Sequence, residues 1–102
     1  MSFQSEPDDD YFSNFWLTAI AIDPIISGIS REEVRLKLLE DNIESRPLWK
    51  PMHLQPIFQN TLFFGDGTSE SLFDQGLCLP SGSNLSADEK ERIRQSLLEV
   101  LV

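Results

Sequence analysis

Hydrophobic residues form one long run near the start of the chain and recur at spaced positions further along it. The run FWLTAIAI, Phe15–Ile22, is rich in aromatic and β-branched residues and predicts a strand. Both alternating sets of positions in this run are largely apolar, so we expect the strand to be covered on both faces. Asp23-Pro24 and Ser27-Gly28 are typical breakers and are expected to end it.

Two helices are predicted by the same start signal. The spacing Ser-x-x-Glu, which is typical of a capping box, occurs at Ser30 and again at Ser86. The first helix is expected to run to about Asp41, with Asn42 as a left-handed terminator. The second is expected to run toward the end of the chain, and its apolar stripe consists of Ile93, Leu97 and Leu101, supported by Leu98 and Val100.

The segment between these helices contains several short predicted elements. HLQPIF, residues 53–58, is expected to hold a helical turn, and residues 62–64 a short strand. A turn at residues 65–67 precedes a predicted short helix, which Thr68 or Ser69 would cap and Gly76 would end in the left-handed position. Residues 77–79, LCL, then predict a short buried strand.

This order of strands and helices favours an α+β fold, a small sheet with helices packed on it. A length of 102 residues allows one domain with a modest core. Residues 1–12 are polar and acidic and are expected to be a lead-in or linker, and residues 13–102 the domain itself.

Charge and rare residues narrow the classes of function. Seventeen acidic and eight basic residues give a formal charge of −9, which argues against a nucleic-acid partner. No apolar run approaches the length that spans a membrane, so no membrane partner is expected. The single cysteine, Cys78, cannot form an internal disulfide and is expected to be a buried thiol in a reducing, cytoplasmic compartment. With His53 as the only histidine, no histidine metal cluster is expected.

The run RPLWKPMH, residues 46–53, concentrates rare side chains in a segment whose two prolines exclude a regular helix. It could be a rigid connector, with Trp49 filling the core and Lys50 facing solvent. The connector is the slightly favoured reading; the other is a stiff loop that presents Arg46, Trp49, Lys50 and His53 to a ligand, because binding sites need side chains placed in advance. The residues alone leave both readings open.

Three segments resemble one known family. NIESRPLWKPMHLQPIF (residues 42–58) resembles a signature segment of the DegT/DnrJ/EryC1/StrS family, pyridoxal-phosphate-dependent aminotransferases that act on nucleotide sugars. SNFWLTAIAID (residues 13–23) resembles the first strand of the family's small domain, and LFDQGLCLPSGSNLSADEKERI (residues 72–93) its closing strand, loop and helix. Phe15 departs from the pattern, which more often has a basic or polar residue there.

The resemblance implies the C-terminal small domain of a fold-type-I aminotransferase, without the large domain that binds pyridoxal phosphate. None of Lys37, Lys50 and Lys90 matches the family's Schiff-base lysine, so the chain alone is expected to bind no cofactor and to be catalytically inert. It is expected to begin at an engineered boundary or to be a truncated product.

By the same resemblance, the parent enzyme would be a cytoplasmic homodimer. It would transfer an amino group from glutamate to a nucleotide-linked keto-deoxy sugar. Arg46, Trp49, Lys50 and His53 would border the cleft for cofactor and substrate.

A stand-alone binding or regulatory module derived from that domain is the alternative. The surface distinguishes a domain of a larger enzyme from a stand-alone module, because a domain that packs on a larger partner should expose an apolar patch. Trp16, Trp49 and Met52 are the residues expected to form it. A self-sufficient module should bury them.

Overall fold

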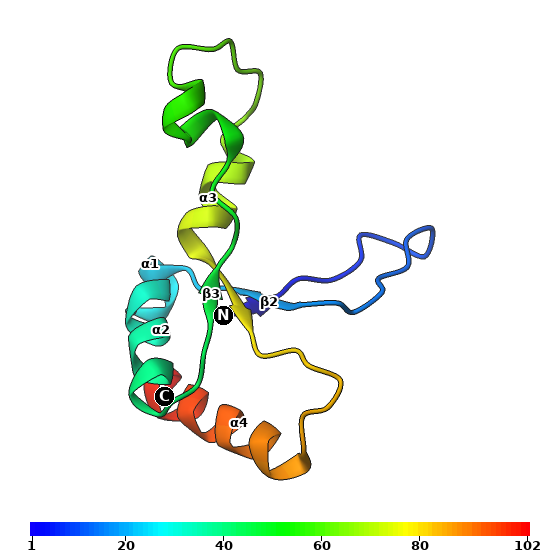
Figure 1. Cartoon of the computed structure of the whole chain (residues 1–102), viewed down its shortest axis with the longest axis vertical. Helices are drawn as coiled ribbons and strands as arrows, with labels where there is room; N and C mark the ends of the chain where they lie inside the picture. Colours follow the sequence, from blue (N-terminus) through cyan, green and yellow to red (C-terminus); the bar gives the residue numbers. More distant parts are fainter.

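A four-stranded antiparallel sheet organises the computed structural model, which describes residues 1–102 (Figure 1). The strands are β1 (Ser2–Phe3), β2 (Thr18–Ala21), β3 (Arg46–Pro47) and β4 (Gly76–Leu79), and their order across the sheet is β1-β2-β4-β3. All four residues of the central strand β4 are buried. Because both neighbours of β4 come from earlier parts of the chain, the sheet joins segments that are far apart in sequence.

Helical segments surround this sheet. They are α1 (Pro24–Ser27), α2 (Arg31–Glu40), the 3-10 turns η1 (Met52–Leu54) and η2 (Pro56–Phe58), α3 (Thr68–Gln75) and α4 (Ala87–Leu101). The capping boxes predicted at Ser30 and Ser86 are both present, and each serine hydroxyl accepts the N–H of the glutamate three residues on at 3.2 Å. The prediction that Asn42 ends α2 in the left-handed region is confirmed by its φ of 57°.

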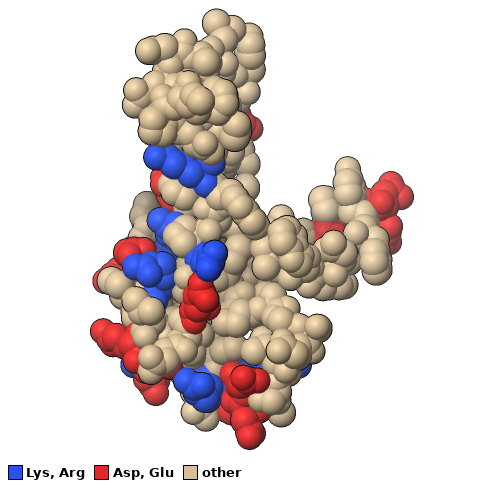
Figure 2. Space-filling model, in the orientation of Figure 1, with Lys and Arg blue, Asp and Glu red and all other residues tan.

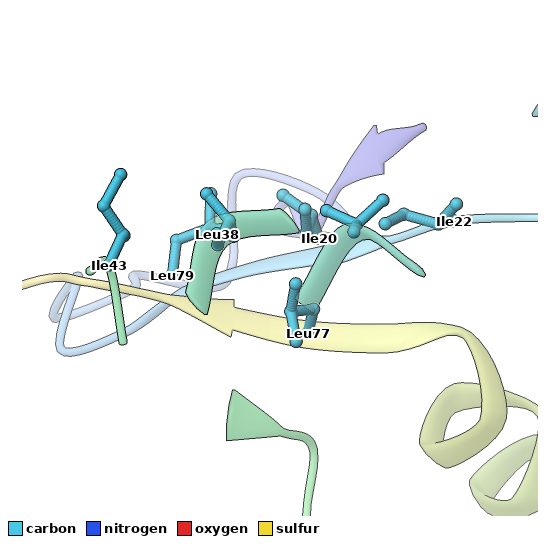
Figure 3. Packing of buried hydrophobic residues seen from close by; sticks show 7 residues of the cluster. Ile20, Ile22, Leu38, Ile43, Leu77 and Leu79 are labelled. Carbon is cyan, nitrogen blue, oxygen red and sulfur yellow. The ribbon is translucent and has the colours of Figure 1, made fainter. Parts of the chain in front are cut away.

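The core lies between α2, α4 and one face of the β2–β4 pair. Figure 3 shows the side chains that the two strands and α2 contribute to it. Its fully or nearly fully buried side chains are Ile20, Ile22, Val34, Leu38, Ile43, Leu77 and Leu79. The stripe predicted on α4 is confirmed, because Ile93, Leu97 and Leu101 pack against this cluster. The fold is therefore a small α+β domain, as the sequence predicts.

A polar joint fixes the end of α2 against α4. The hydroxyl of Ser96, which is buried, donates to Asp41 Oδ2 at 2.6 Å. Lys37 Nζ lies 3.5 Å from the same carboxylate and 3.2 Å from Glu99 Oε2. The hydrogen bond from Ser96, together with the nearby positive charge of Lys37, lowers the pKa of Asp41.

Two segments project from the domain, and they make it elongated (Figure 1). The radius of gyration is 15.4 Å and the principal extents are 47 × 33 × 27 Å; a compact chain of this length would have a radius of gyration of about 13 Å. One projection is the arm, residues 48–75, which carries η1, η2 and α3. The other is the N-terminal loop, residues 4–17, between β1 and β2. No residue of the arm is fully buried.

The strand predicted for residues 15–22 is shorter than expected. β2 begins only at Thr18, because Phe15 has a φ of 52°, which no extended strand can contain. Ser13 Oγ accepts the N–H of Phe15 and Asn14 Oδ1 that of Trp16, both at 3.1 Å, so local turns replace the strand there. The expected cover on both faces is only partly present, since Ala19 and Ala21 are half-buried.

Three other expectations were wrong in detail. Residues 62–64 form no strand and have no ladder partner. Gly67, not Thr68 or Ser69, is the residue that caps α3. Gly76 has extended backbone, with φ −89° and ψ 138°, and begins β4 instead of ending the helix in the left-handed region.

The helical turn predicted within residues 53–58 is confirmed by η1 and η2, and the buried strand at residues 77–79 by β4. β1 and α1 were not predicted. No helix in the structure has both the length and the apolar character needed to cross a bilayer.

Candidate functional site

An open groove of about 580 Å³ lies beside the edge of the sheet. It is formed by residues 43–49, the loop that follows β4 and the first half of α4, with Trp16 at its rim. Apolar side chains supply about half of its lining, and its charged residues are two arginines, Arg46 and Arg92, and two glutamates, Glu44 and Glu89. It combines an apolar wall with a few charged groups, as small-molecule sites commonly do.

Two tryptophans stand together at this groove although they come from distant parts of the chain. The ring centroids of Trp16 and Trp49 are 6.0 Å apart and the ring planes are inclined by 34°. Trp16 is 67% exposed and Trp49 68%, and the nearby Met52 is also exposed. The predicted exposure of all three is confirmed. The reading of residues 46–53 as a connector with Trp49 in the core is therefore wrong.

The cationic groups of the groove differ in how firmly they are held. Arg46 donates from Nε at 2.9 Å and from Nη2 at 2.6 Å to Glu44 Oε1, but both side chains are largely exposed. Such an exposed pair contributes little to stability and can open without great cost. Arg92 Nη2 instead donates to the carbonyl oxygen of Asp41 at 2.8 Å, which ties it to the α2–α4 joint.

Two further polar groups of the groove bear on its chemistry. The hydroxyl of Ser45 is buried and has no hydrogen-bond partner within the chain. Burial raises the pKa of the Cys78 thiol. Cys78 is thus a protonated, packed side chain near neutral pH and not a nucleophile, and the prediction of a buried thiol is confirmed.

His53 lies in the arm and not in the groove. Its Nε2 is 2.6 Å from Glu70 Oε1, and its ring stacks on Phe63 with centroids 3.6 Å apart and planes inclined by 15°. The side chain of His53 is only 13% exposed. Lys50 is exposed and lies between the groove and this cluster along the chain.

Of the four predicted site residues, the structure places Arg46 and Trp49 together on the groove and leaves Lys50 and His53 outside its lining. The partners of His53 were not found from the sequence. Glu70 is 17 residues from His53, and no local spacing connects them. Trp16 was predicted only as a patch residue, and the folding of β2 against β4 brings it to Trp49.

The groove lacks a group that holding pyridoxal phosphate covalently would need. No lysine lines it, whereas such cofactors are carried as a Schiff base on a lysine. Lys37 forms ion pairs with Asp41 and Glu99 and does not line the groove. The groove therefore offers no lysine for that attachment, and no reaction step through the cofactor is derived from its residues. The chain also brings no three His, Cys, Asp or Glu side chains into a metal-binding group.

The sequence is similar to known aminotransferases along most of its length. The model of the DegT/DnrJ/EryC1/StrS aminotransferase family matches residues 1–98. EpsN of Bacillus subtilis (strain 168), which is provisionally named a pyridoxal phosphate-dependent aminotransferase, is 45% identical over 92 residues, covering 86% of this chain and 23% of EpsN. GDP-perosamine synthase of Escherichia coli O157:H7 is 30% identical over 90 residues, covering 88% of this chain and 24% of that protein.

A solved structure shares the fold. The aminotransferase TlmJ from Streptoalloteichus hindustanus superimposes with a TM-score of 0.81 at 16% identity, over 98% of this chain and 26% of TlmJ. The chain thus spans about a quarter of the length of the relatives it matches.

Proposed function

Because this chain belongs to the DegT/DnrJ/EryC1/StrS aminotransferase family, we propose that it is the C-terminal small domain of a pyridoxal-phosphate-dependent sugar aminotransferase. The whole enzyme transfers an amino group from glutamate to the keto carbon of a nucleotide-linked deoxy sugar. The observation that carries the proposal is the exposed Trp16–Trp49 pair on a groove with a loosely held arginine. These are the features of one wall of a substrate cleft.

The side chains of this wall suit a nucleotide sugar. An indole face can stack on a base or cover a sugar ring, and Trp49 is one of the residues that line the groove. Arg46 can exchange its exposed bond to Glu44 for a phosphate, which a guanidinium binds through two parallel N–H groups. When bound, pyridoxal phosphate supplies the electron sink for amino transfer. This domain orients the substrate and closes its cleft.

The cofactor lysine belongs, in this proposal, to a large domain that packs against the groove, and the enzyme is a cytoplasmic homodimer. The exposure of Trp16 and Trp49 supports this arrangement, because exposed apolar patches mark contact surfaces. The chain spans only about a quarter of the length of its relatives, which favours this arrangement over a stand-alone binding or regulatory module.

The direct test measures amino transfer by the full-length protein from the source cells. Purified enzyme with pyridoxal phosphate, glutamate and a nucleotide-linked 4-keto-6-deoxy sugar should produce an aminated sugar nucleotide and 2-oxoglutarate. The 102-residue chain assayed alone should give neither product. Failure of the full-length protein with both uridine- and guanosine-linked keto sugars would reject the proposal.

His53→Ala in the full-length enzyme tests whether the arm contributes to the cleft. We expect kcat/KM to fall by about tenfold to a hundredfold, the scale of loss when a positioned group moves by about 1 Å. His53→Phe keeps a ring that can stack on Phe63 but has no ring nitrogen. Its kcat/KM should fall by a similar factor if a ring nitrogen contacts the substrate. Gln59→Ala, an exposed arm position, is the matched control. Unchanged turnover in a folded His53→Ala enzyme would show that His53 lies away from the cleft.

A further inference from the structure

The arm depends on a single long-range side-chain hydrogen bond. Every other side-chain hydrogen bond within residues 48–75 joins groups no more than five residues apart, whereas that between His53 and Glu70 spans 17. It therefore connects the η1 side of the arm to α3. No arm residue is fully buried, so the orientation of the His53 ring depends mainly on this hydrogen bond and on the stacking against Phe63.

Glu70 is itself held in place by the fold. It lies in the first turn of α3, and α3 runs without a break into the buried central strand β4. The backbone of α3 thus connects Glu70 directly to the central strand. His53 lies on a segment with two 3-10 turns and two prolines, and its ring is oriented by the contact with Glu70.

This contact also decides which ring nitrogen carries hydrogen. An ionised carboxylate only accepts hydrogen bonds, so the 2.6 Å contact requires that Nε2 of His53 be protonated. In the neutral ring Nδ1 is then the acceptor. Nδ1 has no hydrogen-bond partner within the chain and is not among the buried unpartnered atoms, so it remains accessible.

We propose that Glu70 is a positioning residue that fixes His53 as the Nε2–H tautomer and presents Nδ1 as a hydrogen-bond acceptor. The group that Nδ1 meets is a donor, and for the substrate class proposed above it is a sugar hydroxyl. That identification of the donor rests on the proposed function. The pairing and the tautomer rest only on the geometry of this chain. Carboxylates fix histidine tautomers in the same way in metal sites and in catalytic triads.

Nuclear magnetic resonance of the 102-residue chain tests the tautomer without cofactor or substrate. His53 is the only histidine, so ¹⁵N-labelled histidine gives one pair of ring signals. At about pH 8.5, where histidine is ordinarily neutral, wild-type protein should show the Nε2–H pattern and a downfield Nε2–H proton that exchanges slowly with water. Wild-type signals averaged between the two tautomers would overturn the proposal directly.

Variants of Glu70 separate positioning from packing. Glu70→Ala should abolish the slowly exchanging proton and move the ring nitrogens toward the averaged pattern of a free imidazole. Glu70→Gln should retain the wild-type tautomer only partly, because its amide can accept from Nε2–H through its oxygen or donate to Nε2 through its NH2 group. Asp74→Ala, an exposed position on the same helix, is the control and should change nothing. A wild-type ring pattern in Glu70→Ala, with the β2 and β4 amide signals unchanged, would show that Glu70 does not set the tautomer.

The functional half of the proposal is tested in the full-length enzyme. If Glu70 acts through His53, the double variant Glu70→Ala/His53→Ala should lose no more kcat/KM than His53→Ala alone. Losses that multiply would show that Glu70 acts by another route. If the enzyme transfers amino groups and neither variant changes kcat/KM, His53 does not contribute to the cleft. The proposed reaction would still stand in that case.

Discussion

At the scale of single residues, Gly76 connects the arm to the sheet. A β-carbon at this position would lie 2.1 Å from Leu48 Cδ1 and 2.3 Å from the carbonyl oxygen of Leu72. The first neighbour is a side chain, but the second is helix backbone that cannot retreat. Gly76 also accepts the N–H of Leu48 at 3.2 Å, so the two ends of the arm meet there. The glycine is required for this close approach and not for a left-handed conformation.

Gly76→Ala should therefore destabilise the domain. We expect a loss of about 1–3 kcal/mol in the free energy of unfolding, which is typical of overpacking at a well-packed position. Urea denaturation followed by tryptophan fluorescence would measure it. Gly82→Ala is the matched control, because its closest neighbour is the flexible end of the Asn84 side chain. Equal midpoints for the two variants would contradict this account of Gly76.

At the scale of elements, the joint between α2 and α4 makes stability depend on pH. The hydrogen bond from Ser96, aided by Lys37 and Arg92, lowers the pKa of Asp41 in the folded state. A carboxyl whose pKa is lowered by folding stabilises the native state above its unfolded pKa of about 3.9 and loses that contribution as pH falls through the folded value. The contact between the two helices should weaken in acid.

Asp41→Asn should flatten this part of the pH dependence. Wild-type protein should lose more stability than the variant between about pH 5 and pH 3, on either side of the unfolded pKa. Denaturation midpoints at the two pH values would measure the difference, with Asp74→Asn on the surface of α3 as the control. Parallel losses in wild type and Asp41→Asn would mean that other carboxylates dominate acid unfolding.

Elements that are encoded locally were the ones that the sequence predicted well. The capping boxes at Ser30 and Ser86, the terminator Asn42 and the stripe on α4 all depend on neighbours within a few residues. β1 could not be predicted, because Ser2–Phe3 is a strand only through its pairing with β2. Residues 62–64 have the composition of a strand but find no partner in the arm.

The candidate site was predicted in the same uneven way. The unusual composition of residues 46–53 was enough to single out Arg46 and Trp49, which the groove brings together. The separation of His53 from the groove, and its pairing with Glu70, depend on how the arm folds back on itself. Contacts of this kind have no periodic or spacing signal in one sequence.

At the scale of the whole molecule, charge and apolar surface are segregated (Figure 2). No Lys, Arg, Asp or Glu occurs in residues 51–65, and Figure 2 shows that most of the visible face of the upper arm carries no charged side chain. Acidic residues gather at the far end of the N-terminal loop and along the helices. The tip of the arm exposes the large hydrophobic side chains Leu54, Ile57, Leu62 and Phe64. Together with the tryptophan pair, these side chains form apolar surfaces, which in soluble proteins mark contact sites.

The isolated chain should self-associate through the tryptophan pair. Trp16→Ser/Trp49→Ser should lower the apparent mass at high concentration in analytical ultracentrifugation. It should change the free energy of unfolding by no more than about 0.5 kcal/mol, as for other exposed substitutions. Trp16→Phe/Trp49→Phe keeps the surface apolar and should associate like wild type. Association that persists in the serine variant would locate the contact elsewhere, with the uncharged tip of the arm as the next surface to test.

The order of strands in the sheet has a consequence for how quickly the native state is reached. β2 has no sheet partner except β1 until β4 arrives, and β4 is separated from β2 by α2 and the whole arm. That large loop must close before the central pairing can form, and its closure costs entropy ahead of any gain. The helices can form early, because their signals are local. The central strand pairing of the sheet can form only when residues 76–79 reach β2. Refolding should accordingly be slower than that of a helical bundle of equal length, and the slow step should coincide with the burial of β4.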